Sequence, residues 1–228
     1  MNKTDTKNQY VRILSAGVQL EGILSVPEAA KGLVVFVHGS GSSRHSPRNQ
    51  YVAQTLQEGG LATLLFDLLT AQEEEIDLQT RHLRFDVDLL ARRTVGVLDW
   101  LALQPHDYVS RIGLFGSSTG AAAALIAAAE LPDTVHAVVS RGGRPDLANQ
   151  ALPKVQAPTL LIVGSDDEAV IHLNRQALAQ MQPGENKRLI TVPGASHLFQ
   201  EPGTLEHAAR LATNWFQTYL SAVNVQQV

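Results

Sequence analysis

The chain has 228 residues, of which 44% are hydrophobic and 18% are charged, and its formal net charge is −4. This is the composition of an ordinary soluble globular protein, and the acidic balance argues against nucleic acid or a membrane surface as a partner. The chain has no cysteine, which excludes disulfides, a cysteine nucleophile and thiolate metal sites. Residues 1–9 are polar and lack the apolar core of a signal peptide, so a cytoplasmic location is expected.

The first elements predicted in chain order are two strands of an antiparallel hairpin. Val11–Ser15 and Val18–Ser25 flank the turn residues Ala16-Gly17. Residues 1–9 before the hairpin and residues 221–228 at the other end of the chain are expected to be flexible.

A continuous apolar run follows at residues 32–37, as expected of a strand that is buried on both faces of a sheet. The loop His38–Ser43, rich in glycine and serine, comes directly after it. Ser46 and Pro47 then predict the start of a helix, which Gly59-Gly60 ends.

Strands and helices alternate along the rest of the chain. Leu61–Phe66 is another buried strand, and Gln72–Asp77, with three consecutive glutamates, is expected to be a solvated loop. Asp86–Gln104 has apolar residues at helical spacing. Further strands are predicted at Ile112–Phe115, Val135–Ser140, Thr159–Val163 and Leu189–Val192, with helices that begin near Ser118, Ile171 and Leu205. This order predicts one α/β domain over residues 1–228, with a mostly parallel sheet and helices on both faces.

The segment Gly116–Gly120 has the pattern of a nucleophile elbow, G-x-S-x-G. A strand-like run at residues 111–115 precedes it, and the alanine-rich residues 121–129 after it readily form a helix. A strand that turns directly into a helix places the central residue, Ser118, in an exposed and strained position. The pattern alone also fits a glycine-rich turn without chemistry, so its meaning depends on partners elsewhere in the chain.

An acidic and an imidazole side chain follow two later strands. Gly164–Asp167 comes directly after the strand that ends at Val163, and Gly194–His197 after the strand that ends at Val192. Because the carboxyl ends of parallel strands meet at the edge of a sheet where ligands bind, we expect both groups to lie near Ser118. A serine nucleophile needs such a base, and the base needs a partner that holds its tautomer. The order serine, aspartate, histidine is that of α/β-hydrolases.

These motifs, together with the loop His38–Gly41, resemble those of the α/β-hydrolase superfamily, and in particular its dienelactone-hydrolase-like group, over residues 11–220. The resemblance implies the α/β-hydrolase fold and acyl-transfer chemistry on the catalytic residues Ser118, Asp167 and His197. Dienelactone hydrolase itself uses a cysteine nucleophile, whereas this chain has a serine at the matching position. The resemblance therefore leaves the substrate open.

Three aspartates are candidates for the catalytic acid. Members of the group often have the pattern G-x-x-D-x-x-V, which residues 164–170 match, and this favours Asp167. Asp166 is the second candidate, and Asp146 is the third because some relatives place their acid after the preceding strand. The aspartate of the pair 166–167 that is not the acid is expected to cap the helix that begins near Ile171.

The tetrahedral intermediate of acyl transfer needs hydrogen-bond donors aimed at its oxyanion. The backbone N–H groups of Ser40 and Thr119 are expected to form this oxyanion hole. Because these are backbone roles, side-chain substitutions at both positions are expected to have mild effects. His38, in the same loop as Ser40, is expected to brace the backbone instead of acting as the base.

Cationic side chains near the same edge of the sheet are candidates for binding substrate: Arg44, His45, Arg141 and Arg144. They follow the oxyanion loop and the strand at residues 135–140. Guanidinium groups there suit a carboxylate-bearing ester or lactone. The alternative is that they form salt bridges with Asp146 or with the acidic stretch at residues 72–77.

Fewer than twenty residues separate Ser140 from Thr159, where lipases insert a helical lid, so a minimal lid and an open pocket are expected. The sequence thus predicts a serine hydrolase of small, soluble carboxylic esters, lactones or thioesters. One alternative is amide or short-peptide cleavage or acyl transfer on the same triad, and another is a non-catalytic binding protein on a hydrolase scaffold. No cofactor and no metal is expected, and the protein is expected to be a monomer or a homodimer.

Overall fold

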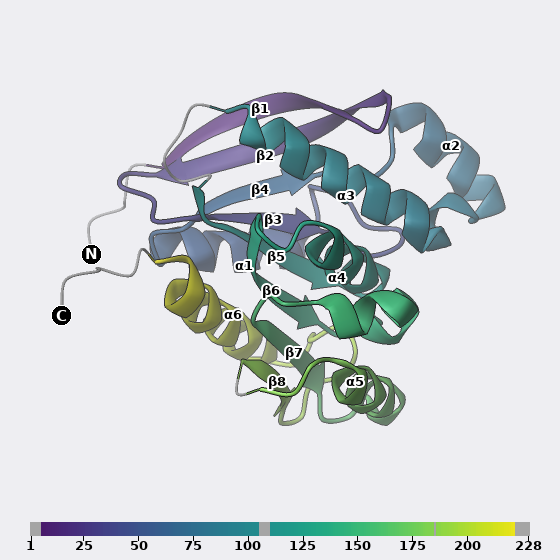
Figure 1. The fold of residues 1–228 in the computed structure, drawn as a ribbon, viewed down its shortest axis with the longest axis vertical. Helices are drawn as coiled ribbons and strands as arrows, with labels where there is room; N and C mark the ends of the chain where they lie inside the picture. The colour runs from purple at the N-terminus through teal and green to yellow at the C-terminus, as the bar shows by residue number, and fades with distance from the viewer. Residues whose placement is uncertain (1–5, 105–109, 185, 222–228) are drawn as a thin grey trace.

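The computed structural model describes residues 6–104, 110–184 and 186–221 of the chain. Its centre is an eight-stranded sheet with the strand order β1-β2-β4-β3-β5-β6-β7-β8 (Figure 1). The strands are β1 (Thr6–Ser15), β2 (Val18–Pro27), β3 (Leu33–Val37), β4 (Ala62–Phe66), β5 (Ile112–Ser117), β6 (Val135–Arg141), β7 (Thr159–Gly164) and β8 (Lys187–Val192). The neighbours from β4 to β8 pair in parallel, and β2 pairs antiparallel with both β1 and β4. The predicted α/β-hydrolase fold class, with its N-terminal hairpin, is confirmed.

The N-terminal hairpin is longer than the sequence predicts. Its register runs from the pair Thr6 and Pro27 to the pair Ser15 and Val18, beside the two-residue turn. The expectation of a flexible segment over residues 1–9 is therefore wrong for residues 6–9, because β2 supplies partners for their backbone groups. Residues 1–5 and 222–228 lie outside the described residues.

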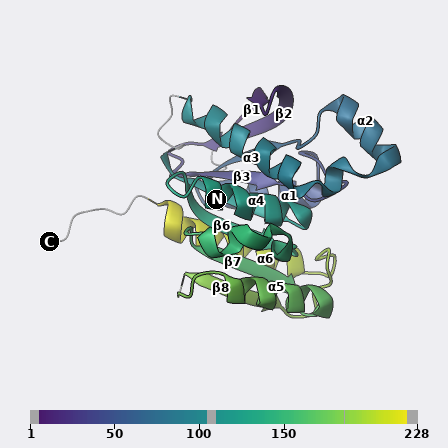
Figure 2. The ribbon, with the colours of Figure 1, turned by 45° about the vertical axis from the view of Figure 1, so that its right-hand side comes forward.

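Helices cover both faces of the sheet (Figures 1 and 2). Helices α1 (Pro47–Glu58) and α6 (Thr204–Leu220) pack on one face, and α3 (Val87–Ala102), α4 (Thr119–Glu130) and α5 (Glu168–Gln180) pack on the other. Every residue of β3, β4 and β5 is buried between these two layers. This explains why these strands are continuous apolar runs in the sequence.

The prediction of a solvated loop at Gln72–Asp77 is wrong, because this stretch lies within the helix α2 (Ala71–Thr80). Thr70 and Glu73 form a capping box: the Glu73 N–H donates to Thr70 Oγ1 at 3.2 Å, and the Thr70 N–H donates to Glu73 Oε2 at 2.8 Å. The short helix η1 (Leu83–Phe85) follows α2 and leads into α3.

The cover between β6 and β7 is short, as the sequence predicts. It consists of η3 (Pro145–Lys154), which packs against α4 and α5. Because this cover is short, the loops after β5, β6 and β7, which carry candidate functional residues, stay near the surface.

Candidate active site

Ser118 lies between β5 and α4 in a backbone conformation that is rare for a residue other than glycine. Its φ is 49° and its ψ is −126°, which costs a non-glycine residue about 1–3 kcal/mol. A Cβ added at Gly116 would lie 2.4 Å from Ala121 Cα, and one at Gly120 would lie 2.2 Å from the Val37 carbonyl oxygen. Glycine is therefore the residue that fits on each side of Ser118, as an elbow requires.

The loop after β3 packs directly against Ser118. A Cβ added at Gly39 would lie 2.8 Å from Ser118 Cβ. The Ser40 N–H donates to Thr119 Oγ1 at 3.1 Å. Thr119 begins α4, so its own N–H is one of the first-turn donors that have no acceptor within the helix. Both residues predicted to supply oxyanion donors, Ser40 and Thr119, thus lie beside the elbow.

The Thr119 hydroxyl ties the loop after β3 to the first turn of α4. It accepts the Ser40 N–H, and it also lies 3.4 Å from Ser40 Oγ. The expectation that side-chain substitutions at Thr119 are mild does not take this tether into account. Without the hydroxyl, the Ser40 N–H loses the acceptor that orients it.

His38 braces the same loop, as the sequence analysis expects. Its Nδ1–H donates to the Gly39 carbonyl at 2.9 Å, and its Nε2 accepts the Leu68 N–H at 3.0 Å. Burial lowers the pKa of the His38 imidazole below the ordinary value of 6.5. The neutral ring therefore bridges the ends of β3 and β4 with both of its nitrogens engaged.

His197 and Asp167 come from different loops and meet at the same edge of the sheet. The His197 Nδ1–H donates to Asp167 Oδ2 at 2.7 Å, and 42% of the His197 side chain is exposed. A Cβ added at Gly142 would lie 3.8 Å from His197 Cε1. Gly142 directly follows Arg141, the β6 residue that pairs with Ser117. The imidazole therefore lies at the carboxyl end of β6, and Ser118 lies at the carboxyl end of the neighbouring strand β5.

The other two candidate acids have different partners. Asp166 Oδ1 accepts a hydrogen bond from Ser165 Oγ at 2.9 Å, and Asp146 accepts two from Arg144, at 2.9 and 2.7 Å. Asp167 stands at the cap position of α5, but its side chain makes no capping hydrogen bond. The prediction that the remaining aspartate caps this helix is therefore wrong, since the Asp166 carboxylate turns to Ser165 instead.

Two of the four cationic candidates are in ion pairs. Arg44 pairs with Asp67, at the end of β4, and with Glu21 of β2. Arg144 pairs with Asp146, which is one of the salt bridges that the sequence offers as an alternative. Both guanidinium groups thus have carboxylate partners within the protein.

The other two cationic candidates differ in their exposure. His45 is exposed, and its backbone N–H donates to Ser43 Oγ at 3.2 Å. Arg141 reaches the predicted edge of the sheet but is only 8% exposed, and its Nη2 donates to Asn49 Oδ1 at 3.4 Å. Arg141 therefore belongs to the packed interior beneath the loops.

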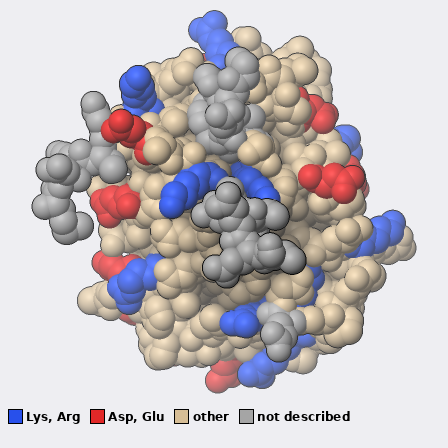
Figure 3. All heavy atoms as spheres, turned by 60° about the vertical axis from the view of Figure 1, so that its left-hand side comes forward, with Lys and Arg blue, Asp and Glu red and all other residues tan. Residues whose placement is uncertain are grey.

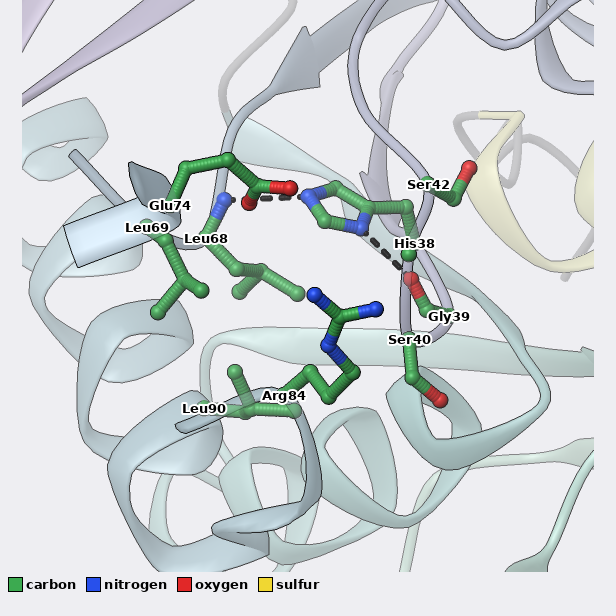
Figure 4. Close-up of a pocket in the computed structure, with 10 residues that line it drawn as sticks. His38, Gly39, Ser40, Ser42, Leu68, Leu69, Glu74, Arg84 and Leu90 are labelled. Carbon is green, nitrogen blue, oxygen red and sulfur yellow. Dashed lines mark hydrogen bonds between the residues drawn. The ribbon is translucent and has the colours of Figure 1, made fainter. Parts of the chain in front are cut away.

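A pocket with about 240 Å³ of empty space, part of it open to solvent, lies beside the loop that follows β3 (Figure 4). Residues 38–42 form one wall, and Leu68-Leu69 and Leu90 line other parts of it. Glu74 of α2 and Arg84 of η1 supply the charged groups. Neither residue is among the candidates that the sequence offers, because this stretch of the chain shows no helical hydrophobic period.

The Arg84 side chain is held in the pocket by Asp77, which is fully buried. Arg84 Nε donates to Asp77 Oδ2, Arg84 Nη2 donates to the Asp77 carbonyl at 3.1 Å, and the Leu83 N–H donates to Asp77 Oδ1 at 2.7 Å. Burial acts to raise the pKa of Asp77, but the hydrogen bonds from Arg84 and Leu83 outweigh it and lower that pKa overall. Asp77 is thus a charged anchor for the cation in the pocket wall.

Within the described ranges, no three or more His, Cys, Asp or Glu side chains are grouped so that they could hold a metal ion. No helix in the same part of the chain is long and apolar enough to cross a membrane. Basic and acidic side chains are interspersed over the face that Figure 3 presents.

The family model described as "Dienelactone hydrolase family" matches residues 20–221. The chain belongs to the dienelactone hydrolase family. It is similar to the solved structure of dienelactone hydrolase from Anabaena variabilis, with 59% sequence identity and a TM-score of 0.91 over 94% of this chain and 98% of that chain. This member of the dienelactone hydrolase family carries a serine at the elbow and has no cysteine.

Curated relatives of this dienelactone hydrolase family member carry different names. "Putative phosphoribosyl transferase" of Mycobacterium tuberculosis is 54% identical over 214 residues, which are 94% of this chain but 47% of that protein. "Putative carboxymethylenebutenolidase" of Aquifex aeolicus is 22% identical over 93% of this chain and 99% of that protein. The chain therefore spans about half the length of the first relative, whose name describes a longer protein.

Proposed function

We propose that this protein is a serine hydrolase that cleaves a small carboxylic ester, lactone or thioester through an acyl-enzyme on Ser118. The observation that carries the proposal is that Ser118, with its strained backbone, follows β5, while the hydrogen-bonded pair of His197 and Asp167 lies at the carboxyl end of the neighbouring strand β6. Membership of a hydrolase family supports the same reaction class.

In the proposed acylation step, His197 Nε2 takes the proton of the Ser118 hydroxyl as Oγ attacks the substrate carbonyl carbon. The 2.7 Å hydrogen bond to Asp167 fixes the tautomer with a proton on Nδ1 and stabilises the imidazolium that forms. The proton then passes from Nε2 to the leaving group as its bond to the acyl carbon breaks. Water repeats the cycle on the acyl-enzyme, which releases the carboxylic acid and frees Ser118.

Negative charge develops on the carbonyl oxygen during both steps, and preorganised donors stabilise it. We assign this role to the N–H groups of Thr119 and Ser40. In the structure the Ser40 N–H donates to Thr119 Oγ1, so its proposed role requires a bifurcated hydrogen bond to both that hydroxyl and the oxyanion. The tether keeps this N–H directed toward the start of α4, next to Ser118.

The pocket beside the oxyanion loop supports a small substrate. Its leucine side chains suit a short apolar group. The short cover formed by η3 adds no surface for long acyl chains.

A panel of p-nitrophenyl esters tests this function and the substrate size together. We expect kcat/KM for the acetate and butyrate esters to exceed that for emulsified palmitate by about tenfold or more, because the short cover formed by η3 offers a long acyl chain little apolar surface. We also expect p-nitroanilides of the same short acids to react more slowly. A preference for emulsified palmitate would contradict the small substrate, and faster cleavage of the anilides would favour an amidase.

Substrate binding by Arg44, His45, Arg141 and Arg144 stays a prediction. An anionic substrate would have to share Arg44 and Arg144 with their carboxylate partners. Arg84 is the cation that lines the pocket, and its link to Asp77 fixes where its charge lies.

A further inference from the structure

Arg141 is the last residue of β6, and it pairs in register with Ser117, the residue before the proposed nucleophile. Its guanidinium lies over the rings of Phe115 and Phe199, with Cζ 5.8 and 5.9 Å from the two ring centroids. Its Nη2 donates to Asn49 Oδ1 at 3.4 Å. One buried side chain thus contacts three separate segments of the chain.

Each of these segments carries part of the proposed catalytic machinery. Phe115 lies in β5, three residues before Ser118. Phe199 lies two residues after His197, and its φ of 54° is a strained, left-handed value that its surroundings must maintain. Asn49 is buried in the first turn of α1, directly after the oxyanion loop.

Among the described residues, no carboxylate pairs with the buried guanidinium of Arg141. Arg141 forms no ion pair there, and its Nη1 has no hydrogen-bond partner. Burial, and then the like charge of Arg48, lower the pKa of Arg141 to about 10, so the group stays charged at neutral pH. By contrast, the buried guanidinium of Arg93 pairs with Glu73.

Stability alone does not explain a buried charge without a counter-ion. Replacing buried ionic groups by apolar residues of similar volume often leaves stability unchanged or raises it. The ring faces of Phe115 and Phe199 offset part of the cost of desolvating Arg141, through cation–π attraction. What an apolar side chain could not supply is the simultaneous contact with two rings and an amide oxygen.

We propose that Arg141 is a positioning residue that holds the segments of Ser118, His197 and the oxyanion loop in register. The inference rests on the proposed serine-hydrolase function, and Arg141 acts through the three residues that it contacts. A planar guanidinium can lie over aromatic rings and donate from its edge at the same time, which a lysine ammonium cannot do. A misplacement of about 1 Å can cost about a hundredfold in rate, so the loss of Arg141 should lower kcat.

The test compares Arg141→Met and Arg141→Lys with the control Arg188→Met, which removes an exposed guanidinium. Arg188 also lies over an aromatic ring, that of Trp215 at 6.0 Å, but it stands near the start of β8, away from the carboxyl edge of the sheet. Kinetics are measured on one neutral and one anionic ester, with Tm measured alongside. Active sites are counted with a fluorophosphonate, so that kcat refers to competent enzyme.

We expect Arg141→Met to lower kcat about ten- to a hundredfold on both esters, with KM little changed and Tm equal to or above that of the wild type. Arg141→Lys should also lose kcat, because it keeps the charge but not the planar fork. Arg188→Met should keep the wild-type kcat.

An unchanged kcat in Arg141→Met overturns the inference. A rise in KM confined to the anionic ester also overturns it, because Arg141 would then bind substrate. If Arg141→Met does not fold, Asn49→Ala removes one of the three contacts and keeps the guanidinium, and an unchanged kcat in that variant overturns the inference as well. A wild-type protein that neither labels nor hydrolyses esters would instead reject the proposed function.

Discussion

Thr119 follows the proposed nucleophile, and both its backbone N–H and its side chain contribute to the proposed oxyanion hole. Oγ1 accepts the Ser40 N–H at 3.1 Å. Valine has nearly the same shape but cannot accept this bond, so we expect Thr119→Val to lower kcat about tenfold. Loss of a whole oxyanion donor costs more, about 10²- to 10³-fold. Steady-state kinetics on p-nitrophenyl acetate measure the change.

Thr119→Ser is the matched control, because it keeps the hydroxyl and should keep most of the activity. A valine variant with wild-type kcat would contradict the role of the tether. That result would support the expectation that side-chain substitutions at Thr119 have mild effects because only its backbone N–H takes part.

At the scale of single residues, the sequence predicts which residue types stand after which strands, but not every partner. Asp167 and His197 could be placed because each follows a strand that ends at the same edge. The Thr119 tether could not be predicted, since its partner Ser40 lies 79 residues away along the chain. The pairing of Arg44 with Asp67 crosses 23 residues and depends on how β3 and β4 lie side by side.

At the scale of elements, α2 was missed for a physical reason. Asp77 is the one residue of this helix that is buried, so the sequence shows no apolar stripe at helical spacing. Its start could have been found, because Thr70 and Glu73 have the spacing of a capping box. A helix that is stabilised by a buried ion pair has no apolar residues at helical spacing by which the sequence would predict it.

The pair of Asp77 and Arg84 makes α2 and η1 sensitive to acid. Because the folded protein lowers the pKa of Asp77, the pair stabilises the fold at neutral pH. This stabilisation is lost as the pH falls from the ordinary value of 3.8 through the lower pKa of the folded state. Asp77→Asn should therefore be less stable than the wild type at neutral pH and lack this acid-dependent loss.

Urea unfolding of both proteins from about pH 7 to about pH 2 measures this effect. The difference in free energy of unfolding between wild type and Asp77→Asn should narrow at the acid end. A difference that stays constant over the whole range would contradict the role of the Asp77 charge.

At the scale of the whole molecule, the alternation of strands and helices predicts the fold class because each apolar strand needs cover on both faces. The hairpin and the parallel strands follow from local patterns. Local patterns do not determine that β3 pairs with both β4 and β5, since this depends on α1 crossing one face and α3 the other. The same crossing brings the oxyanion loop against Ser118.

Labelling by a fluorophosphonate, read by mass spectrometry of the intact protein and its peptides, tests whether Ser118 is the nucleophile. Ser117→Ala is the matched control, because it removes the neighbouring hydroxyl, which lies within β5 and is buried. We expect a single adduct, on Ser118, in the wild type and in Ser117→Ala, and none in Ser118→Ala with its fold intact. Undiminished labelling of Ser118→Ala would contradict it.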